Sequence, residues 1–165
     1  PSLLAVNFAD ASPATVKEGD PAPMIEALNQ DSKWVKLADF KGRPIVLFFY
    51  PKDDTPGCTK QACKLRDVYR EFQKRKVAVF GVSRQSAASH AEFRTKHKLP
   101  YDLLVDEDGA IGSKFVIDQM PIVGFFKRQT VLIGADGKIL RIFRDVDPET
   151  HDSMILETLA STDKP

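Results

Sequence analysis

One segment constrains this chain more than any other: the continuous apolar run Ile45-Val46-Leu47-Phe48-Phe49-Tyr50, which leads directly into a proline. An uninterrupted stretch of β-branched and aromatic residues is typical of a strand covered on both faces, as parallel strands are in α/β sheets. Pro51 ends the strand, Pro56-Gly57 marks a turn, and a helical pattern starts near Cys58. We therefore expect a central strand, a short loop and a helix, in that order.

The rest of the chain continues this alternation of strands and helices. The expected elements are a hairpin at 24–37, helices at 58–76, 86–98 and 108–115, strands at 77–82 and 103–105, a hairpin pairing 130–133 with 139–143, and a final helix from Asp147-Pro148-Glu149 to Leu159. This order predicts an α/β fold with a mixed central sheet, helices on both faces and an N-terminal β-hairpin. The right-handed crossover rule makes the first three sheet strands parallel.

Length and charge limit the domain count and the partners. A chain of 165 residues corresponds to one domain, 1–165, in which residues 1–15 form an extended lead-in. The longest apolar run is too short to span a membrane, so we expect a soluble protein. With 24 Lys and Arg against 23 Asp and Glu, the chain has no charge excess to neutralise phosphates, which argues against nucleic acid as a partner.

The compartment remains open. Residues 2–11 read like a short remnant of a trimmed presequence, which fits a cytoplasm, a plastid stroma or a periplasm.

Cys58 lies in the first turn of the expected helix, just beyond the central strand. Free backbone N–H groups and the positive end of the helix dipole favour an anion there, and therefore the thiolate. Thr55 can aim its hydroxyl at the sulfur or at a bound oxygen, while Pro51 and Pro56 stiffen the loop and shield the sulfur. A structural cysteine would be expected in an apolar stripe instead. The sequence predicts a nucleophile in a loop suited to a small oxygen substrate.

Cys63 follows five positions later. In an ideal helix, residues five apart have Cα atoms roughly 8.6 Å from each other, beyond the roughly 7 Å limit for a disulfide. A disulfide between Cys58 and Cys63 would therefore require the first turns of the helix to unwind; the alternative is that Cys63 is a core residue. Two thiols fall short of a zinc site, because His90, His97 and His151 are scattered along the chain. We expect no metal or organic cofactor.

Arg128 precedes the late hairpin. A guanidinium beside the sulfur would favour the thiolate and could hold a peroxide oxygen. From spacing alone, however, Arg128 reads as a solvated surface residue, and so do Arg66 and Arg84, of which Arg66 is also a plausible ion-pair partner on its helix.

The order Pro51, three residues, Thr55, two residues, Cys58 resembles the active-site motif of the peroxiredoxins. Cys63 and the segment 128–130 resemble the Q-type, or bacterioferritin-comigratory, subgroup. Lys127 occupies a position where members commonly have glycine.

This resemblance covers about residues 16–159 and implies a thioredoxin-like fold. It implies that Cys58 is the peroxidatic cysteine and Cys63 the resolving cysteine, and that the site is completed by Pro51, Thr55 and Arg128. Arg128 becomes a site residue on this ground alone.

The expected activity is that of a thiol-dependent peroxidase acting on hydrogen peroxide and alkyl hydroperoxides. Cys58 would form a sulfenic acid, Cys63 would condense with it, and thioredoxin or glutaredoxin would restore both thiols. Since both cysteines lie on one helix, a monomer can complete the cycle. The alternatives are a general thiol-disulfide oxidoreductase, which usually has two residues between its cysteines, and a redox-sensing interaction module exposed by helix unwinding.

Overall fold

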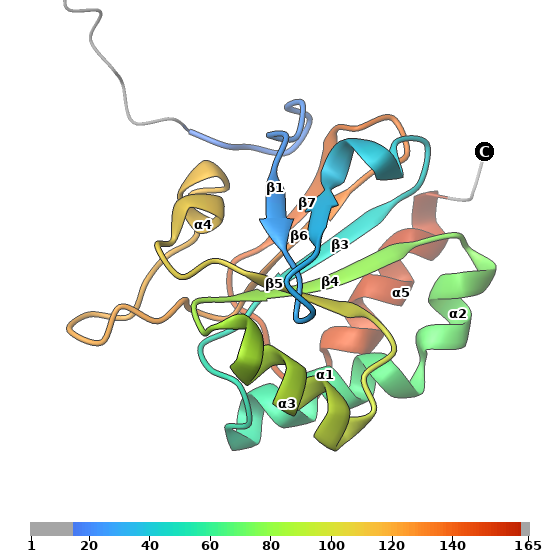
Figure 1. Ribbon diagram of the computed structural model, residues 1–165. Coiled ribbons are helices and arrows are strands. Elements are labelled where there is room, and N and C mark those ends of the chain that lie inside the picture. The colour runs from blue at the N-terminus through green and yellow to red at the C-terminus, as the bar shows by residue number, and fades with distance from the viewer. Residues whose placement is uncertain (1–14, 163–165) are drawn as a thin grey trace, which may run out of the picture.

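A five-stranded mixed sheet forms the centre of the computed structural model, which describes residues 15–162 (Figure 1). Its strand order is β5-β4-β3-β6-β7, with bounds β3 (Ile45–Phe49), β4 (Ala78–Ser83), β5 (Asp102–Val105), β6 (Gln129–Ile133) and β7 (Ile139–Phe143). Strands β3, β4 and β5 are parallel, and β6 runs antiparallel to both β3 and β7. The predicted central strand and the parallel order of the first three sheet strands are confirmed.

Strand β3 is buried along its whole length because both of its faces are covered. Ile45, Leu47 and Phe49 contribute to one hydrophobic cluster, whereas Val46 and Phe48 contribute to the other. The alternation follows from the two-residue period of a strand, which sends successive side chains to opposite faces. An uninterrupted apolar run is therefore what this central position requires.

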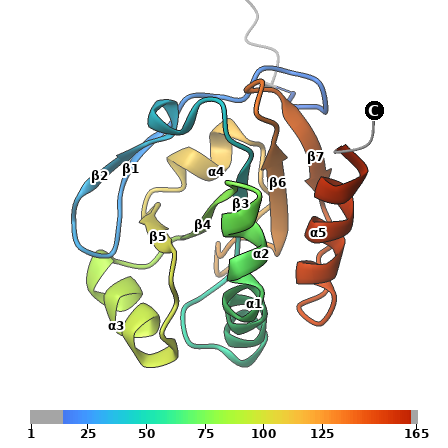
Figure 2. The same ribbon diagram turned by 90° about the vertical axis from the view of Figure 1, so that its right-hand side faces the viewer.

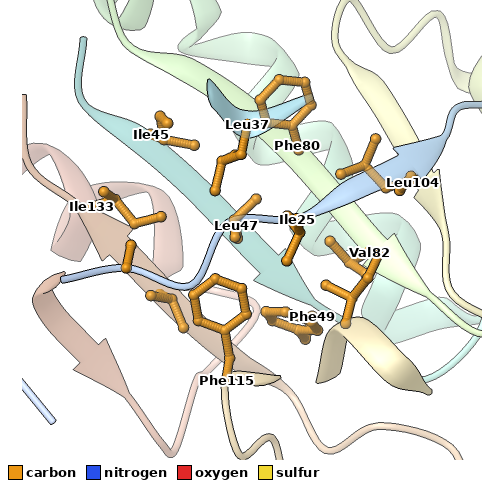
Figure 3. Close-up of a cluster of buried hydrophobic side chains, with 14 of the residues drawn as sticks. Ile25, Leu37, Ile45, Leu47, Phe49, Phe80, Val82, Leu104, Phe115 and Ile133 are labelled. Atoms are coloured by element: carbon orange, nitrogen blue, oxygen red, sulfur yellow. The ribbon is translucent and has the colours of Figure 1, made fainter. Parts of the chain in front are cut away.

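Helices cover the two faces unequally. One face carries α1 (Pro56–Asp67), α2 (Tyr69–Lys74), α3 (Ala87–His97) and α5 (His151–Thr162), and α1 and α5 lie side by side (Figure 2). The other face carries the short α4 (Ala110–Lys114), the 3₁₀ helix η1 (Leu37–Phe40) and the predicted N-terminal hairpin of β1 (Glu26–Leu28) and β2 (Trp34–Lys36). Figure 3 shows the cluster on this second face, where Ile25 and Leu37 lie beside Leu47.

Three helix boundaries differ from the prediction. The helix expected over 58–76 begins at Pro56 and breaks at Val68, whose ψ of 11° interrupts the helix and separates α1 from α2. The final helix begins at His151 rather than Asp147, because the Asp147 carboxylate accepts a hydrogen bond from the Glu149 N–H and forms a turn there. The helix expected over 108–115 is only five residues long.

Two expectations remain outside what the structure tests. The expected lead-in, residues 1–15, lies outside the described residues except for Thr15, and a single domain over 1–165 stays a prediction. Between Thr15 and Thr162, none of the helices has both the length and the apolar character that crossing a membrane requires.

Candidate active site

The Cys58 thiol occupies the third position of α1, at the carboxyl end of β3. Thr55 caps the helix with extended backbone (φ −87°, ψ 155°), and Pro56 takes the first helical position, where its missing N–H costs no hydrogen bond. Cys58 is only 2% exposed. The structure thus places the Cys58 sulfur where the sequence predicted it, in a shielded first helical turn beside free N–H groups.

Arg128 lies against this sulfur. Its Nη1 and Nη2 atoms donate to Cys58 Sγ over 3.5 and 3.6 Å. The contact arises because β6 pairs with β3 so that Gln129 lies opposite Phe49, which brings the preceding residue to the start of α1. The guanidinium places two N–H donors and a positive charge beside the sulfur. Arg128 is thus partly buried against Cys58 rather than solvated at the surface, and its role in the site stays a prediction.

Gly57 makes room for this arginine. A Cβ atom built on Gly57 would lie 2.9 Å from Arg128 Nη2, closer than such contacts occur. The backbone of Gly57 needs no positive φ, so the close approach of the guanidinium is what requires glycine at this position.

Replacing Gly57 with alanine should separate stability from activity. The added methyl group displaces the flexible end of Arg128, and misplacement on this scale costs roughly 10- to 100-fold in rate. The free energy of unfolding should be unchanged or higher by up to about 1 kcal/mol, since alanine favours helix more than glycine. Thermal unfolding and the rate of peroxide consumption test this together; a Gly57→Ala protein with the wild-type rate would contradict it.

Gln61 is a site residue that the sequence reasoning missed. It is fully buried, and its Oε1 accepts a hydrogen bond of 2.5 Å from Arg128 Nη1. A signal was available, since residues three apart share one face of a helix and Gln61 follows Cys58 by three. Arg128 is thus held by Gln61 on one side and faces Cys58 on the other.

Thr55 and Pro51 lie on the loop before α1. The Thr55 hydroxyl donates to the Lys52 carbonyl over 2.8 Å, so its oxygen is left to accept a hydrogen bond from an approaching O–H group. The Pro51 carbonyl accepts from Gln85 Nε2 over 3.2 Å, which ties the loop to the connection between β4 and α3. Both residues keep the loop positions that the motif suggested.

A second group of buried polar side chains, also unforeseen, holds the same loop. The Asp53 carboxylate accepts from Tyr50 Oη and Ser89 Oγ and faces His90 Nδ1, each over 2.7 Å. His90 Nε2 faces the Leu104 carbonyl over 2.9 Å. Burial, followed by the charge of Asp53, raises the pKa of Tyr50 well above its usual value, so its hydroxyl remains a donor. The loop is therefore anchored to α3 and β5.

An exposed ion pair adds another attachment of the loop to α3. The Asp54 carboxylate contacts His97 Nε2 over 3.0 Å and Lys96 Nζ over 2.7 Å. These hydrogen bonds lower the pKa of Asp54, with His97 the larger cause. Solvent screening makes the pair weak by itself.

Cys63 is half-buried in the same helix as Cys58, and both thiols are free. Between them, the Ala62 carbonyl accepts from Tyr101 Oη over 2.7 Å. This buried contact ties α1 to the chain just before β5 at a point between the two cysteines. Arg66, expected as a helix-face ion-pair partner, donates to the Asp67 carboxylate over 3.0 Å.

Metal ligands do not gather anywhere in the described part of the chain: within residues 15–162 no group of three or more His, Cys, Asp or Glu side chains could hold an ion. The group at the carboxyl end of β3 is a shielded thiol between a helix N-terminus and a guanidinium, and the sheet that presents it is thioredoxin-like. These two features define the class, a cysteine-dependent oxidoreductase.

The chain belongs to the AhpC/TSA family, whose model matches residues 18–142, and within it to the peroxiredoxins of the Q or Bcp type. It is 41% identical to a chloroplastic peroxiredoxin Q of Oryza sativa subsp. japonica, over 88% of this chain and 68% of the rice protein. It is 37% identical to peroxiredoxin Bcp of Bacillus subtilis, over 88% of this chain and 96% of that protein.

Solved structures agree with this assignment. The crystal structure of a PrxQ variant from Xylella fastidiosa superimposes with a TM-score of 0.85 at 27% identity, covering 92% of this chain and 99% of that one. Peroxidoxin BcpB from Mycobacterium tuberculosis gives a TM-score of 0.82 at 30% identity, covering 89% and 98%. The predicted thioredoxin-like α/β fold is confirmed.

Proposed function

We propose that this chain, a thiol-dependent peroxidase by family, reduces hydroperoxides through Cys58. The observation that carries the proposal is the pair of N–H groups that Arg128 directs at Cys58 Sγ from 3.5 and 3.6 Å, at a helix N-terminus. Both features favour the thiolate, which is the attacking form of cysteine.

In the first step, the Cys58 thiolate attacks one oxygen of the substrate O–O bond. An S–O bond forms, the O–O bond breaks, and the leaving oxygen departs as water or alcohol after taking a proton. Cys58 is oxidised to sulfenic acid while the peroxide is reduced by two electrons. Arg128 donates to the oxygens as charge moves along the O–O bond, and the Thr55 hydroxyl oxygen accepts the O–H of the bound hydroperoxide, because its own proton is committed to Lys52.

In the second step, the Cys63 thiol condenses with the sulfenic acid, forming the S–S bond and releasing water. The two residues lie in one intact helix, so α1 has to unwind between them, and the Tyr101 contact to the Ala62 carbonyl is lost. Thiol-disulfide exchange with a thioredoxin-type dithiol then restores both thiols. One copy of the chain holds every group that the cycle uses, and we propose that it works as a monomer.

The substrates we propose are hydrogen peroxide and alkyl hydroperoxides. Support comes from the bacterioferritin comigratory protein of Xanthomonas campestris, a similar structure (TM-score 0.79, 29% identity) whose description concerns alkyl peroxide reduction activity. We propose thioredoxin or glutaredoxin as reductant. Since a dithiol reductant needs a reducing compartment, and relatives include chloroplastic and Bacillus proteins, we place the chain in a plastid stroma or a cytoplasm.

A comparison of two assays tests the proposal against a general thiol-disulfide oxidoreductase. The wild-type protein should consume hydrogen peroxide with thioredoxin, thioredoxin reductase and NADPH, and should not accelerate the reduction of insulin disulfides by dithiothreitol. Insulin reduction without peroxide turnover would favour the general oxidoreductase. A partner that binds only the oxidised chain, with negligible peroxide turnover, would favour a redox-sensing module.

A further inference from the structure

A line of buried hydrogen bonds continues from Arg128 away from the sulfur. Gln61 accepts from Arg128 through Oε1 over 2.5 Å, and its Nε2 contacts His151 Nδ1 over 3.1 Å. The other ring nitrogen, His151 Nε2, contacts Thr130 Oγ1 over 2.7 Å. His151 opens α5, Gln61 belongs to α1 and Thr130 to β6, so three elements meet at these contacts. The proposed reaction uses no group beyond Gln61.

Hydrogen-bond chemistry fixes the direction of every contact in this line. A guanidinium only donates, so the side of the Gln61 amide that faces Arg128 is its oxygen. The amide NH₂ therefore faces His151 Nδ1, which has to be the unprotonated, accepting nitrogen. The ring proton then lies on Nε2 and is donated to Thr130 Oγ1. One tautomer of His151 satisfies all the contacts.

Burial excludes water as an alternative hydrogen-bond partner for these side chains. Gln61 and Thr130 are 0% exposed and His151 is 1% exposed, so water cannot replace a lost partner. Burial first, and the charge of Arg128 second, lower the pKa of His151 to about 3. The groups that face the ring are the amide of Gln61 from α1, the hydroxyl of Thr130 from β6 and the aromatic ring of Phe48 from β3. The ring is therefore neutral throughout the physiological range.

We propose that His151 is a positioning residue of the peroxidase: as the neutral Nε2–H tautomer it orients the Gln61 amide, and Gln61 in turn holds Arg128 against the Cys58 sulfur. The inference rests on the proposed function, since it assigns His151 a role in that reaction. It acts through two other side chains and touches neither substrate nor sulfur.

Loss of the accepting nitrogen has a defined consequence. The Gln61 NH₂ group becomes a buried donor without a partner, a costly state that the side chain relieves by rotating. Rotation withdraws Oε1 from Arg128, whose guanidinium is then free to leave Cys58. We expect the rate of Cys58 oxidation by hydrogen peroxide to fall about tenfold, which corresponds to about 1.4 kcal/mol.

Two substitutions of His151 separate positioning from packing. His151→Leu removes the acceptor but keeps an apolar side chain of similar bulk, whereas His151→Asn offers an amide oxygen near the place of Nδ1. In a Cys63→Ser background we would measure the rate of Cys58 oxidation and the pH profile of Cys58 alkylation. His151→Leu should be about tenfold slower, with its alkylation profile displaced to higher pH, and His151→Asn should recover most of the difference.

The control is Met154→Ala, one turn along α5 and half-buried. It should lower the unfolding temperature and leave the alkylation profile in place, because a packing defect alone does not move the guanidinium. A folded His151→Leu protein with the wild-type rate and profile would overturn the proposal, as would a His151→Asn protein as impaired as His151→Leu.

Nitrogen NMR of the intact wild-type protein gives a second test that does not depend on how the variants fold. At pH 7 the His151 ring should show an unprotonated Nδ1 and a protonated Nε2; the opposite tautomer or the imidazolium would overturn the proposal. This result is independent of turnover. A protein with the expected tautomer and no peroxidase activity would contradict the proposed function and leave the hydrogen-bond arrangement supported.

Discussion

Substitution of Cys58 by serine should abolish peroxide turnover, because a serine hydroxyl is not ionised near neutral pH and cannot replace the proposed sulfur nucleophile. We expect the rate with thioredoxin to fall at least about 10³-fold, to the level of the reaction without enzyme. Cys63→Ser should behave differently: it should form one sulfenic acid per chain, detectable with a sulfenate-specific probe, and then stall with thioredoxin. Both variants should unfold near the wild-type temperature, since the changes in volume are small.

The pair of variants also tests the order of events. If Cys58→Ser retained near-normal turnover, the assignment of the nucleophile would be wrong. If Cys63→Ser instead sustained full turnover with thioredoxin, the intramolecular disulfide would not be a required intermediate.

Substitution of Arg128 by methionine should lower the second-order rate constant for hydrogen peroxide by roughly 10²- to 10³-fold. Methionine keeps much of the apolar bulk but removes both N–H groups that lie on Cys58 Sγ, and with them the donors for the developing charge. The rate constant of Arg128→Lys should lie between those of the wild type and Arg128→Met, because an ammonium keeps the charge without the fixed fork of donors. The rate is best measured as the pre-steady-state oxidation of Cys58.

Arg141→Met is the matched control for this loss of charge. Arg141 is half-exposed on β7 and pairs with Glu18 over 3.5 Å at the surface. Its substitution should leave the rate within about twofold, as exposed ion pairs contribute little. Equal losses in Arg128→Met and Arg141→Met would mean that general charge, and not contact with the sulfur, governs the reaction.

The path from sequence to site was most direct for Cys58. The apolar run at 45–50 has to be a covered strand, the prolines end it, and the next helix then starts beside the cysteine. Each step uses contacts between near neighbours in the chain, and local geometry decides them. The resemblance assigned Cys63 as the resolving cysteine and joined Thr55 and Pro51 to the site, and these roles stay predictions.

The position of Arg128 could not be predicted from neighbouring residues in the sequence. Its contact with the sulfur exists because β6 pairs with β3 in a particular register, and a shift of one residue would turn the side chain to the other face of the sheet. No spacing in the sequence states that register. His151 and Asp53 were missed for the same reason, because their partners lie on other helices and strands, many residues away.

The helix boundaries show a different limit. The apolar spacing over 58–76 is continuous, yet the backbone breaks at Val68, whose φ of −105° and ψ of 11° depart from the α-helix. A periodic apolar pattern predicts which face of a helix is buried, and it does not reveal a local break in the helix.

The hydrogen bond from Tyr101 to the Ala62 carbonyl should slow the unwinding of α1 after Cys58 is oxidised. In the proposed cycle Cys63 reaches the sulfenic acid only after α1 unwinds around this bond, and until then a second hydroperoxide can convert the sulfenic acid irreversibly to sulfinic acid. We therefore expect the lifetime of this buried contact to influence the peroxide concentration at which the protein is inactivated during turnover. A variant with a weaker Tyr101–Ala62 hydrogen bond should stay active at higher peroxide concentrations, and one with a stronger hydrogen bond should be inactivated at lower concentrations.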